Sequence, residues 1–212
     1  MYKVYARAGW GSVFVEVLLT LAGQKYELIE IDIRGKPDDR RKLAAINPMV
    51  QLPTIVTPDG SVMTESGAIA LYIAEQAPQA KLAPPPGDKL RATYLRWQLF
   101  VVTNIYATFM IDDKPSRWAD GDAAQVAIKQ RANEYRGELL AILEQNAGAP
   151  WFLGDRFSTI DLFISMMTRW SPRRDWYKAN SPKLYAIASS VDEMPALAAI
   201  WARNFGPDKQ YQ

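Results

Sequence analysis

Asn47-Pro48-Met49-Val50-Gln51-Leu52-Pro53-Thr54-Ile55 is the stretch of this chain that decides its fold. It is followed by the turn signal Thr57-Pro58-Asp59-Gly60-Ser61 and then by Thr64-Glu65-Ser66-Gly67-Ala68-Ile69. This order predicts a strand, a tight turn, a second strand and a helix that opens at residues 64–66. A hairpin brings the residue before its first strand beside the residue after its second. We therefore expect Leu52 and Pro53 to lie next to the start of that helix.

The chemistry of this junction suits a peptide-like ligand. Pro53 restricts Leu52 to extended conformations, and a free Leu52 N–H and C=O would pair with an extended ligand as an added strand does. The helix start offers unpaired N–H groups near Ser66, which suit a carboxylate, while Glu65 suits an ammonium group. A ligand with α-amino and α-carboxylate groups at one end and an amide further along is expected. Glutathione meets that description.

The same residues resemble the glutathione-binding half of the glutathione S-transferase family. Its pattern reads roughly Asn-Pro-x-Gly-x-Val-Pro-x-Leu, then Glu/Gln-Ser before an Ala-Ile-x-x-Tyr-Leu helix. The matching residues here are Asn47-Pro48, Leu52-Pro53, Ile55, Glu65-Ser66 and Ala68-Ile69-Ala70-Leu71-Tyr72-Ile73. Val50 departs from the pattern, because it replaces the common glycine.

The resemblance implies roles for these residues. The Leu52 backbone would hold the cysteinyl portion of glutathione, with Pro53 in a cis peptide bond shaping the turn. Glu65 and Ser66 would fix the γ-glutamyl end, and Gln51 would reach the glycine end.

The chain reads as an α/β domain followed by an all-helical one. Strand, helix, strand and helix are expected at Tyr2–Ala6, Ser12–Ala22, Tyr26–Ile33 and Asp38–Ile46. With the hairpin and a helix at Glu65–Gln76, they complete a thioredoxin-like βαβαββα domain over residues 1–80. A Pro-rich linker is expected at 81–88, and an all-helical domain at 89–212. Its predicted helices are Lys89–Ile111, Ala123–Ala147, Thr159–Arg169, Lys183–Val191 and Pro195–Asn204.

A second motif lies in the later half, at Phe157-Ser158-Thr159-Ile160-Asp161-Leu162. Ser158 followed three residues later by Asp161 is a capping box, and it resembles the box that starts the central buried helix of glutathione transferases. We assign both residues to folding and not to chemistry.

Composition excludes several kinds of chemistry. The chain contains no histidine and no cysteine, so a Ser-His-Asp or Cys-His nucleophile, histidine-based metal binding and dithiol redox exchange are not available. A thioredoxin-like domain without its own thiol must use the thiol of its ligand. We expect glutathione as co-substrate and no metal. The net charge is only +2 and the basic residues are scattered. A nucleic-acid partner is therefore not predicted. No apolar run is long or uncharged enough to span a bilayer, and the absence of cysteine gives no sign of secretion, so a cytoplasmic location is expected.

The reactive centre is expected in Arg7-Ala8-Gly9-Trp10-Gly11-Ser12. In the family the corresponding loop supplies a Tyr, Ser or Cys that hydrogen-bonds the glutathione sulfur. Ser12 is the only hydroxyl in this loop and is the predicted catalytic residue, although serine at a helix start also acts as a cap. Ser12 lies a position or so beyond the usual catalytic serine, so backbone N–H groups near Trp10 and Gly11 remain an alternative. Tyr5 is a weaker rival.

The second substrate is expected to bind against the helical domain. Tyr106, Phe109 and Met110 share one helical face, and with Trp10 and Trp118 they are predicted to line an apolar pocket. Trp10 is also a predicted glutathione-binding residue, since its ring could stack over that ligand. Core packing also explains such a face. The expected function is a glutathione transferase acting on a small hydrophobic electrophile, as a homodimer. The alternatives are a non-catalytic scaffold or a glutathione-dependent isomerase, lyase or peroxidase.

Overall fold

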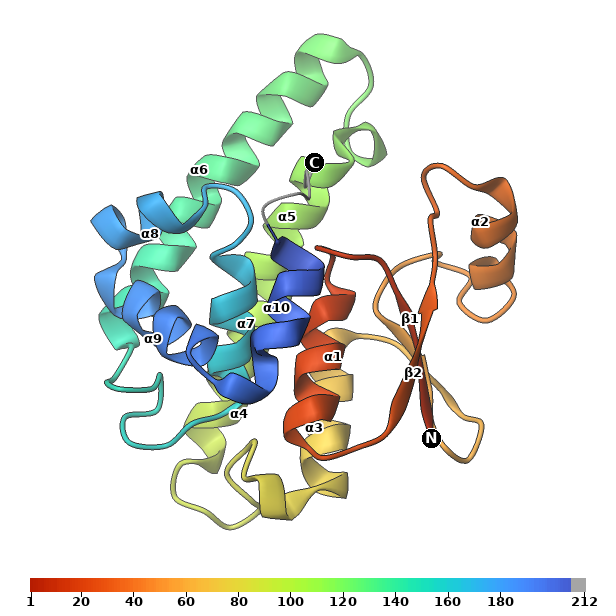
Figure 1. Cartoon of the computed structure of the whole chain (residues 1–212). Helices are drawn as coiled ribbons and strands as arrows, with labels where there is room; N and C mark the ends of the chain where they lie inside the picture. Colours follow the sequence, from red (N-terminus) through yellow and green to blue (C-terminus); the bar gives the residue numbers. More distant parts are fainter. Residues whose placement is uncertain (207–212) are drawn as a thin grey trace.

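The computed structural model describes residues 1–206 and begins with a four-stranded sheet (Figure 1). The strand order is β2-β1-β3-β4. β1 pairs in parallel with β2 and antiparallel with β3, and β3 pairs antiparallel with β4. The strands are β1 (Tyr2–Ala6), β2 (Tyr26–Glu30), β3 (Thr54–Val56) and β4 (Val62–Met63).

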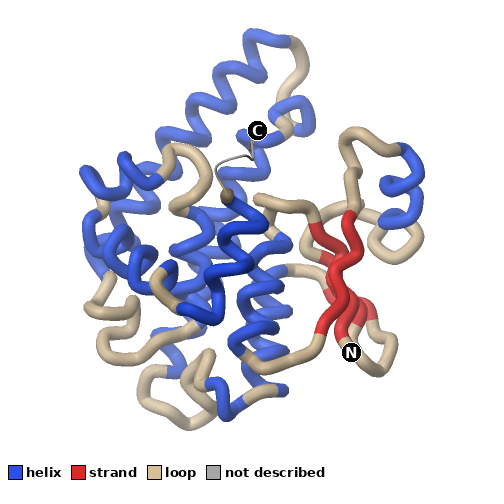
Figure 2. Tube along the Cα trace, in the orientation of Figure 1, coloured by secondary structure: helices blue, strands red, loops and turns tan. Residues whose placement is uncertain are grey.

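Three helices complete this N-terminal domain. They are α1 (Ser12–Leu21), α2 (Pro37–Ala44) and α3 (Ser66–Gln76). In Figure 2, α1 and α3 lie between the sheet and the remaining helices, whereas α2 lies on the other side of the sheet. Leu43 of α2 packs in a small separate core with Tyr5, Ile31 and Val50. The predicted thioredoxin-like arrangement is confirmed, with the ends of elements shifted by a few residues.

A helical domain follows a short 3-10 turn, η1 (Pro78–Ala80). Residues 81–90 contain no helix or strand, and the domain division at 81–88 stays a prediction. The later elements are α4 (Arg91–Phe100), η2 (Val101–Ile105), α5 (Tyr106–Asp113), η3 (Pro115–Arg117), α6 (Asp122–Asn146), α7 (Thr159–Met167), α8 (Arg174–Asn180), α9 (Pro182–Asp192), η4 (Pro195–Leu197) and α10 (Ala198–Phe205).

Two features of this domain differ from the sequence prediction. The single helix expected over Lys89–Ile111 is interrupted by η2, which is a π-helical turn; such turns are rare and are often found at functional sites. The short helix α8 was not predicted, because its polar sequence lacks apolar periodicity. It is anchored instead by Tyr177, which is buried against the core.

The capping box of α7 is confirmed. Ser158 accepts a hydrogen bond from Ile160 N, and Asp161 accepts one from Ser158 N at 2.7 Å. The helix that it starts is wholly buried, and Phe163 stacks on Phe14 of α1 at 3.8 Å between ring centroids. The two domains therefore share one continuous apolar core. No helix within residues 1–206 is long and apolar enough to cross a membrane.

Candidate functional site

The Ser12 hydroxyl faces the inside of its own loop. It accepts a hydrogen bond from Arg7 N at 3.1 Å and donates one to Arg7 O at 3.2 Å, and the residue is fully buried. The one proton of the Ser12 hydroxyl is therefore engaged in the hydrogen bond to Arg7 O. This geometry gives no support to the prediction that Ser12 contacts a sulfur, and it gives Ser12 a role in shaping the loop.

Backbone amides remain at the same point. Gly11 is the N-cap of α1, with φ −56°. Within residues 1–206, the N–H groups of Gly11 and Ser12 have no hydrogen-bond partner, whereas Trp10 N donates to Arg7 O at 3.1 Å. A helix N-terminus with free N–H groups carries a partial positive charge that favours an anion. The predicted alternative, stabilisation by neighbouring amides, stays a prediction, for which Gly11 and Ser12 offer two unpaired N–H groups.

The helical domain holds this loop from two sides at Gly9. Asn204 of α10 accepts a hydrogen bond from Gly9 N at 3.2 Å, and the indole of Trp170 donates to Gly9 O at 2.9 Å. Asn204 also donates to the buried carboxylate of Glu16 at 3.2 Å, which forms an ion pair with Arg203. Gly9 has φ +76°, a conformation that glycine adopts without steric cost.

The predicted peptide-binding segment has the expected free backbone. The Leu52–Pro53 peptide bond is cis, as expected from the resemblance. Within the described residues, Leu52 N and O have no hydrogen-bond partner. The turn before them is fixed by the buried Asn47 amide, which donates to Thr54 Oγ1 at 2.9 Å and to Gln51 O at 3.1 Å. The Gln51 side chain is partly exposed, and its contact with a glycine carboxylate stays a prediction.

Glu65 and Ser66 lie at the start of α3. Glu65 is the N-cap and is exposed, with φ +63° and ψ +105°. A glutamate in this backbone region is strained, and such strain persists where the surrounding structure over-determines it, commonly at ligand sites. Ser66 is buried, and the amides of residues 66–68 open the helix. The side chain of Val102 lies over Gly67, at ordinary van der Waals distance (3.4 Å) from the position that a Cβ there would occupy.

An aromatic cluster lies on the helical side. Tyr106 makes edge-to-face contacts with Phe109 and Trp170, at centroid distances of 6.3 and 5.5 Å, and Phe109 contacts Trp170 at 5.2 Å. Two of the predicted pocket residues are thus brought together. Met110 is partly exposed and Trp118 is 55% exposed after η3. A shared pocket that includes both stays a prediction.

Trp10 belongs to a different cluster. Its ring lies under the guanidinium groups of Arg34 and Arg7, at 4.5 and 5.1 Å, and Arg7 forms an ion pair with Asp32. Its proposed contact with the second substrate is not supported by any ring contact with Tyr106 or Phe109 among the described residues. This edge of the site is rich in cations.

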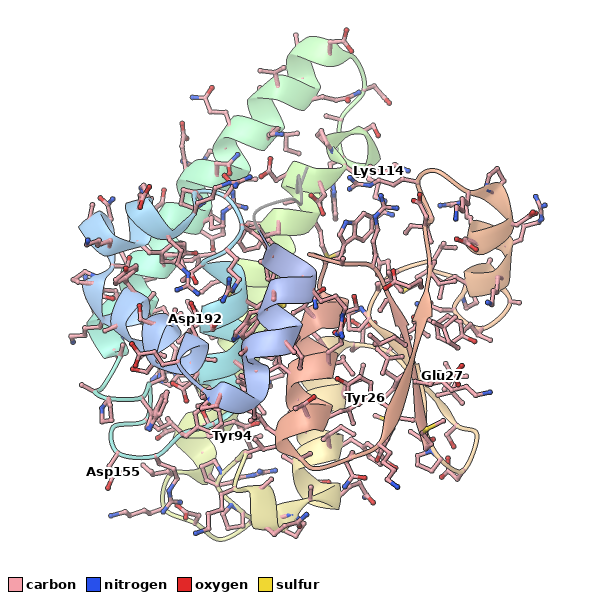
Figure 3. The ribbon with its side chains drawn as sticks, in the orientation of Figure 1. Tyr26, Glu27, Tyr94, Lys114, Asp155 and Asp192 are labelled. Atoms are coloured by element: carbon pink, nitrogen blue, oxygen red, sulfur yellow. The ribbon has the colours of Figure 1, made fainter. Side chains whose placement is uncertain are left out.

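Two charged residues of the helical domain, Asp113 and Lys114, lie toward the edge of the site that carries Trp10 and Arg34 (Figure 3). Burial raises the pKa of the Asp113 carboxyl, while Arg34 acts to lower it. Lys114, which follows α5, lies on the side of the helical domain that faces the segment after β2 (Figure 3). No group of acidic side chains within residues 1–206 is arranged to hold a metal ion.

Three residues of this region were missed by sequence reasoning. Trp170 and Asn204 were not identified because they approach Gly9 only through tertiary packing, across 161 and 195 positions. Arg34 was not identified because a lone arginine after a strand carries no motif.

Comparison with known proteins finds glutathione transferases and GST-like proteins. The family model "Glutathione S-transferase, N-terminal domain" matches residues 14–76. A GST-like protein of Escherichia coli, YncG, which is itself uncharacterized, is 35% identical over 96% of this chain and 98% of its own length. A probable maleylacetoacetate isomerase of Caenorhabditis elegans is 28% identical over 90% of this chain and 87% of its own. A crystal structure of a glutathione transferase homolog from Sulfitobacter, with bound glutathione, superimposes with a TM-score of 0.82. It is 24% identical and covers 94% of this chain and 96% of its own.

Proposed function

The chain belongs to the glutathione S-transferase family, and from this premise we propose that it is a glutathione transferase. In this proposal, glutathione binds where the two domains meet, and its thiolate attacks a small apolar electrophile. The homodimer expected from the resemblance is part of the proposal. Light scattering of the wild type distinguishes a dimer from a monomer.

The observation that carries the proposal is the free backbone of Leu52 beside the N-terminus of α1. Leu52 O lies 3.5 Å from the position that a Cβ on Gly11 would occupy. A cysteinyl residue paired with Leu52 as an added strand would therefore have its sulfur within reach of the first amides of α1. Of these, the amides of Gly11 and Ser12 are unpaired within the described residues, whereas Val13 N donates to Trp10 O and Phe14 N to Gly11 O.

The same site supports the ionisation that the reaction needs. A free thiol has a pKa near 8.5 and is mostly protonated at neutral pH, whereas the thiolate is the nucleophile. Donors that bind the anion shift this equilibrium, and one pKa unit corresponds to about 1.4 kcal/mol. The thiol proton leaves to solvent, and the protein holds the sulfur as an anion.

The γ-glutamyl end is assigned to the start of α3. Its carboxylate would accept hydrogen bonds from the first amides and from Ser66, and its ammonium group would pair with Glu65. The unusual backbone conformation of Glu65 supports a ligand-related role.

Isothermal titration with glutathione tests this division of roles. Glu65→Ala and Ser66→Ala should each weaken binding by roughly 10- to 100-fold, because hydrogen bonds to charged groups contribute about 1.5–3 kcal/mol. Ser12→Ala is the matched control, since its hydroxyl is used within the loop, and it should change affinity far less. Equal losses in all three variants would contradict the assignment, and absence of binding by the wild type would overturn the function.

A glutathione-dependent isomerase is the second candidate, supported by the similarity to a probable maleylacetoacetate isomerase. The two activities differ in what happens to the thiol. A transferase consumes one glutathione per turnover, whereas an isomerase returns it. Measuring free thiol during turnover of a panel of electrophiles and cis-alkene acids separates them. Glutathione binding without any turnover would favour a non-catalytic scaffold.

A further inference from the structure

The hydroxyl of Tyr106 lies at the N-terminus of α1, although Tyr106 belongs to the helical domain. Its oxygen is 2.1 Å from the position that a Cβ on Gly11 would occupy, and Leu52 O is 3.5 Å from that same position. The hydroxyl therefore occupies the space left open by the missing side chain of Gly11. It stands beside both groups that the proposed function assigns to the cysteinyl portion of glutathione.

The ring that carries this hydroxyl is held on several sides. Its edge-to-face contacts are with Phe109, Phe163 and Trp170, at 6.3, 6.4 and 5.5 Å. Trp170 is itself hydrogen-bonded to Gly9 O, so the ring and the loop are fixed to one another. Tyr106 also follows directly on the π-helical turn η2, which shifts the register of the helix before it.

The hydroxyl is a donor without an acceptor. Within residues 1–206, the Tyr106 oxygen makes no hydrogen bond, in contrast to the Tyr94 hydroxyl, which pairs with Thr159 Oγ1 at 2.8 Å. The Tyr106 oxygen is not one of the fully buried side-chain atoms that lack a partner, so it is open to a ligand. The side chain keeps only part of its surface exposed.

We propose that the Tyr106 hydroxyl, and not the Ser12 hydroxyl, donates the hydrogen bond that stabilises the sulfur of bound glutathione. This inference rests on the proposed function, and it names the side chain that donates to the glutathione sulfur. The thiol proton leaves to solvent, the S–H bond electrons stay on sulfur, and Tyr106 keeps its own proton while donating to the anion. The free amides of Gly11 and Ser12 act on the same sulfur from the N-terminal domain.

The state of the phenol agrees with a donor role. Burial raises the pKa of the Tyr106 hydroxyl above its ordinary value, and the nearby Asp113 raises it further. The hydroxyl therefore stays protonated at any pH at which glutathione ionises. It does not compete with the thiol for the proton.

The test is a spectroscopic titration of bound thiolate. With saturating glutathione, the ultraviolet absorbance of the thiolate is followed against pH in the wild type and in Tyr106→Phe. We expect the midpoint to rise by about one to two pH units in the variant, a 10- to 100-fold lower ionisation constant. Tyr135→Phe, which changes an exposed tyrosine of α6, should leave the midpoint in place. Ser12→Ala tests the rival hydroxyl and should shift the midpoint less than Tyr106→Phe does.

Binding of S-methylglutathione separates this inference from the proposed function. Its sulfur cannot ionise, so Tyr106→Phe should bind it as the wild type does while losing affinity for glutathione above the thiol pKa. An unchanged midpoint with intact glutathione binding overturns the role of Tyr106 and leaves the proposed function standing. A wild type that binds neither ligand overturns both, and a midpoint that rises only in Ser12→Ala returns the role to Ser12.

Discussion

Gly11→Ala is the sharpest perturbation that the structure offers, because it places one methyl group against one oxygen. The new Cβ would lie 2.1 Å from the Tyr106 hydroxyl oxygen, 3.4 Å from the carbon that bears it and 3.5 Å from Leu52 O. Only the first contact is shorter than van der Waals distance. The backbone itself tolerates alanine, since Gly11 has helical φ and ψ.

The cost follows from the surroundings of the tyrosine. Because the ring is held by Phe109, Phe163 and Trp170, it cannot swing away without disturbing the core. Inserting a methyl group into a packed site typically costs about 1–3 kcal/mol. Removing the hydroxyl leaves the 3.4 Å contact as the nearest on the ring. In a Tyr106→Phe background, Gly11→Ala should then stabilise the fold by about 0.4–1 kcal/mol through the unfolded chain.

Chemical denaturation of the four proteins in this double-mutant cycle measures the coupling. Gly11→Ala alone should lower the free energy of unfolding by roughly 2 kcal/mol, and the melting temperature by about 4–8 °C for a chain of this size. The cycle should give a coupling of about 2–3 kcal/mol. Effects that add within about 0.5 kcal/mol would mean that the two groups do not touch, and the reasoning about Tyr106 would be refuted.

Three further outcomes are expected. Ser158→Ala removes the cap of α7 and should lower stability by ~1 kcal/mol, measured as a shift of the denaturation midpoint with an unchanged slope. Asn204→Ala leaves Gly9 N without its acceptor and leaves the Glu16 carboxylate with Arg203 but without the Asn204 amide. The unfolding free energy should fall by about 1–3 kcal/mol and amide exchange at Gly9 should accelerate; unaltered exchange would contradict the contact. Burial raises the pKa of Asp161 to about 7, so the folded chain keeps a proton that the unfolded chain releases near pH 4. Its contribution is complete below that pH, and stability should fall by up to about 1.4 kcal/mol per pH unit as the pH rises toward 7. Thermal melts of Asp161→Asn should lack this slope.

Most of the local structure could be predicted, because it depends on neighbours in the sequence. The hairpin, the capping box of Ser158 and Asp161, and the free backbone of Leu52 follow from turn, cap and proline rules. The same rules predict a hydroxyl at the start of α1 but not its direction. Ser12 turns inward because Arg7 offers it both a donor and an acceptor within the loop.

The residues around Gly9 and Gly11 could not be predicted in the same way. The sequence placed Tyr106 on an aromatic face of the helical domain. Its hydroxyl lies beside Gly11 because of the way the two domains pack against each other, which the sequence does not reveal. Trp170 follows the end of α7, and Asn204 belongs to the last turn of α10. Their pairing with the loop depends on tertiary contacts that no local pattern encodes. The π-helical turn η2 is likewise a packing adjustment within an otherwise continuous helical sequence.

The bond between Asn204 and Gly9 has a consequence for synthesis. On the ribosome the sheet and its three helices emerge before α10 does, so Gly9 N lacks its Asn204 acceptor until α10 follows. The first loop reaches its final shape only after nearly the whole polypeptide has left the exit tunnel. Under the proposed function, we expect a chain that ends before α10 to lack the bond that fixes Gly9 and to stabilise the glutathione thiolate less than the full chain does.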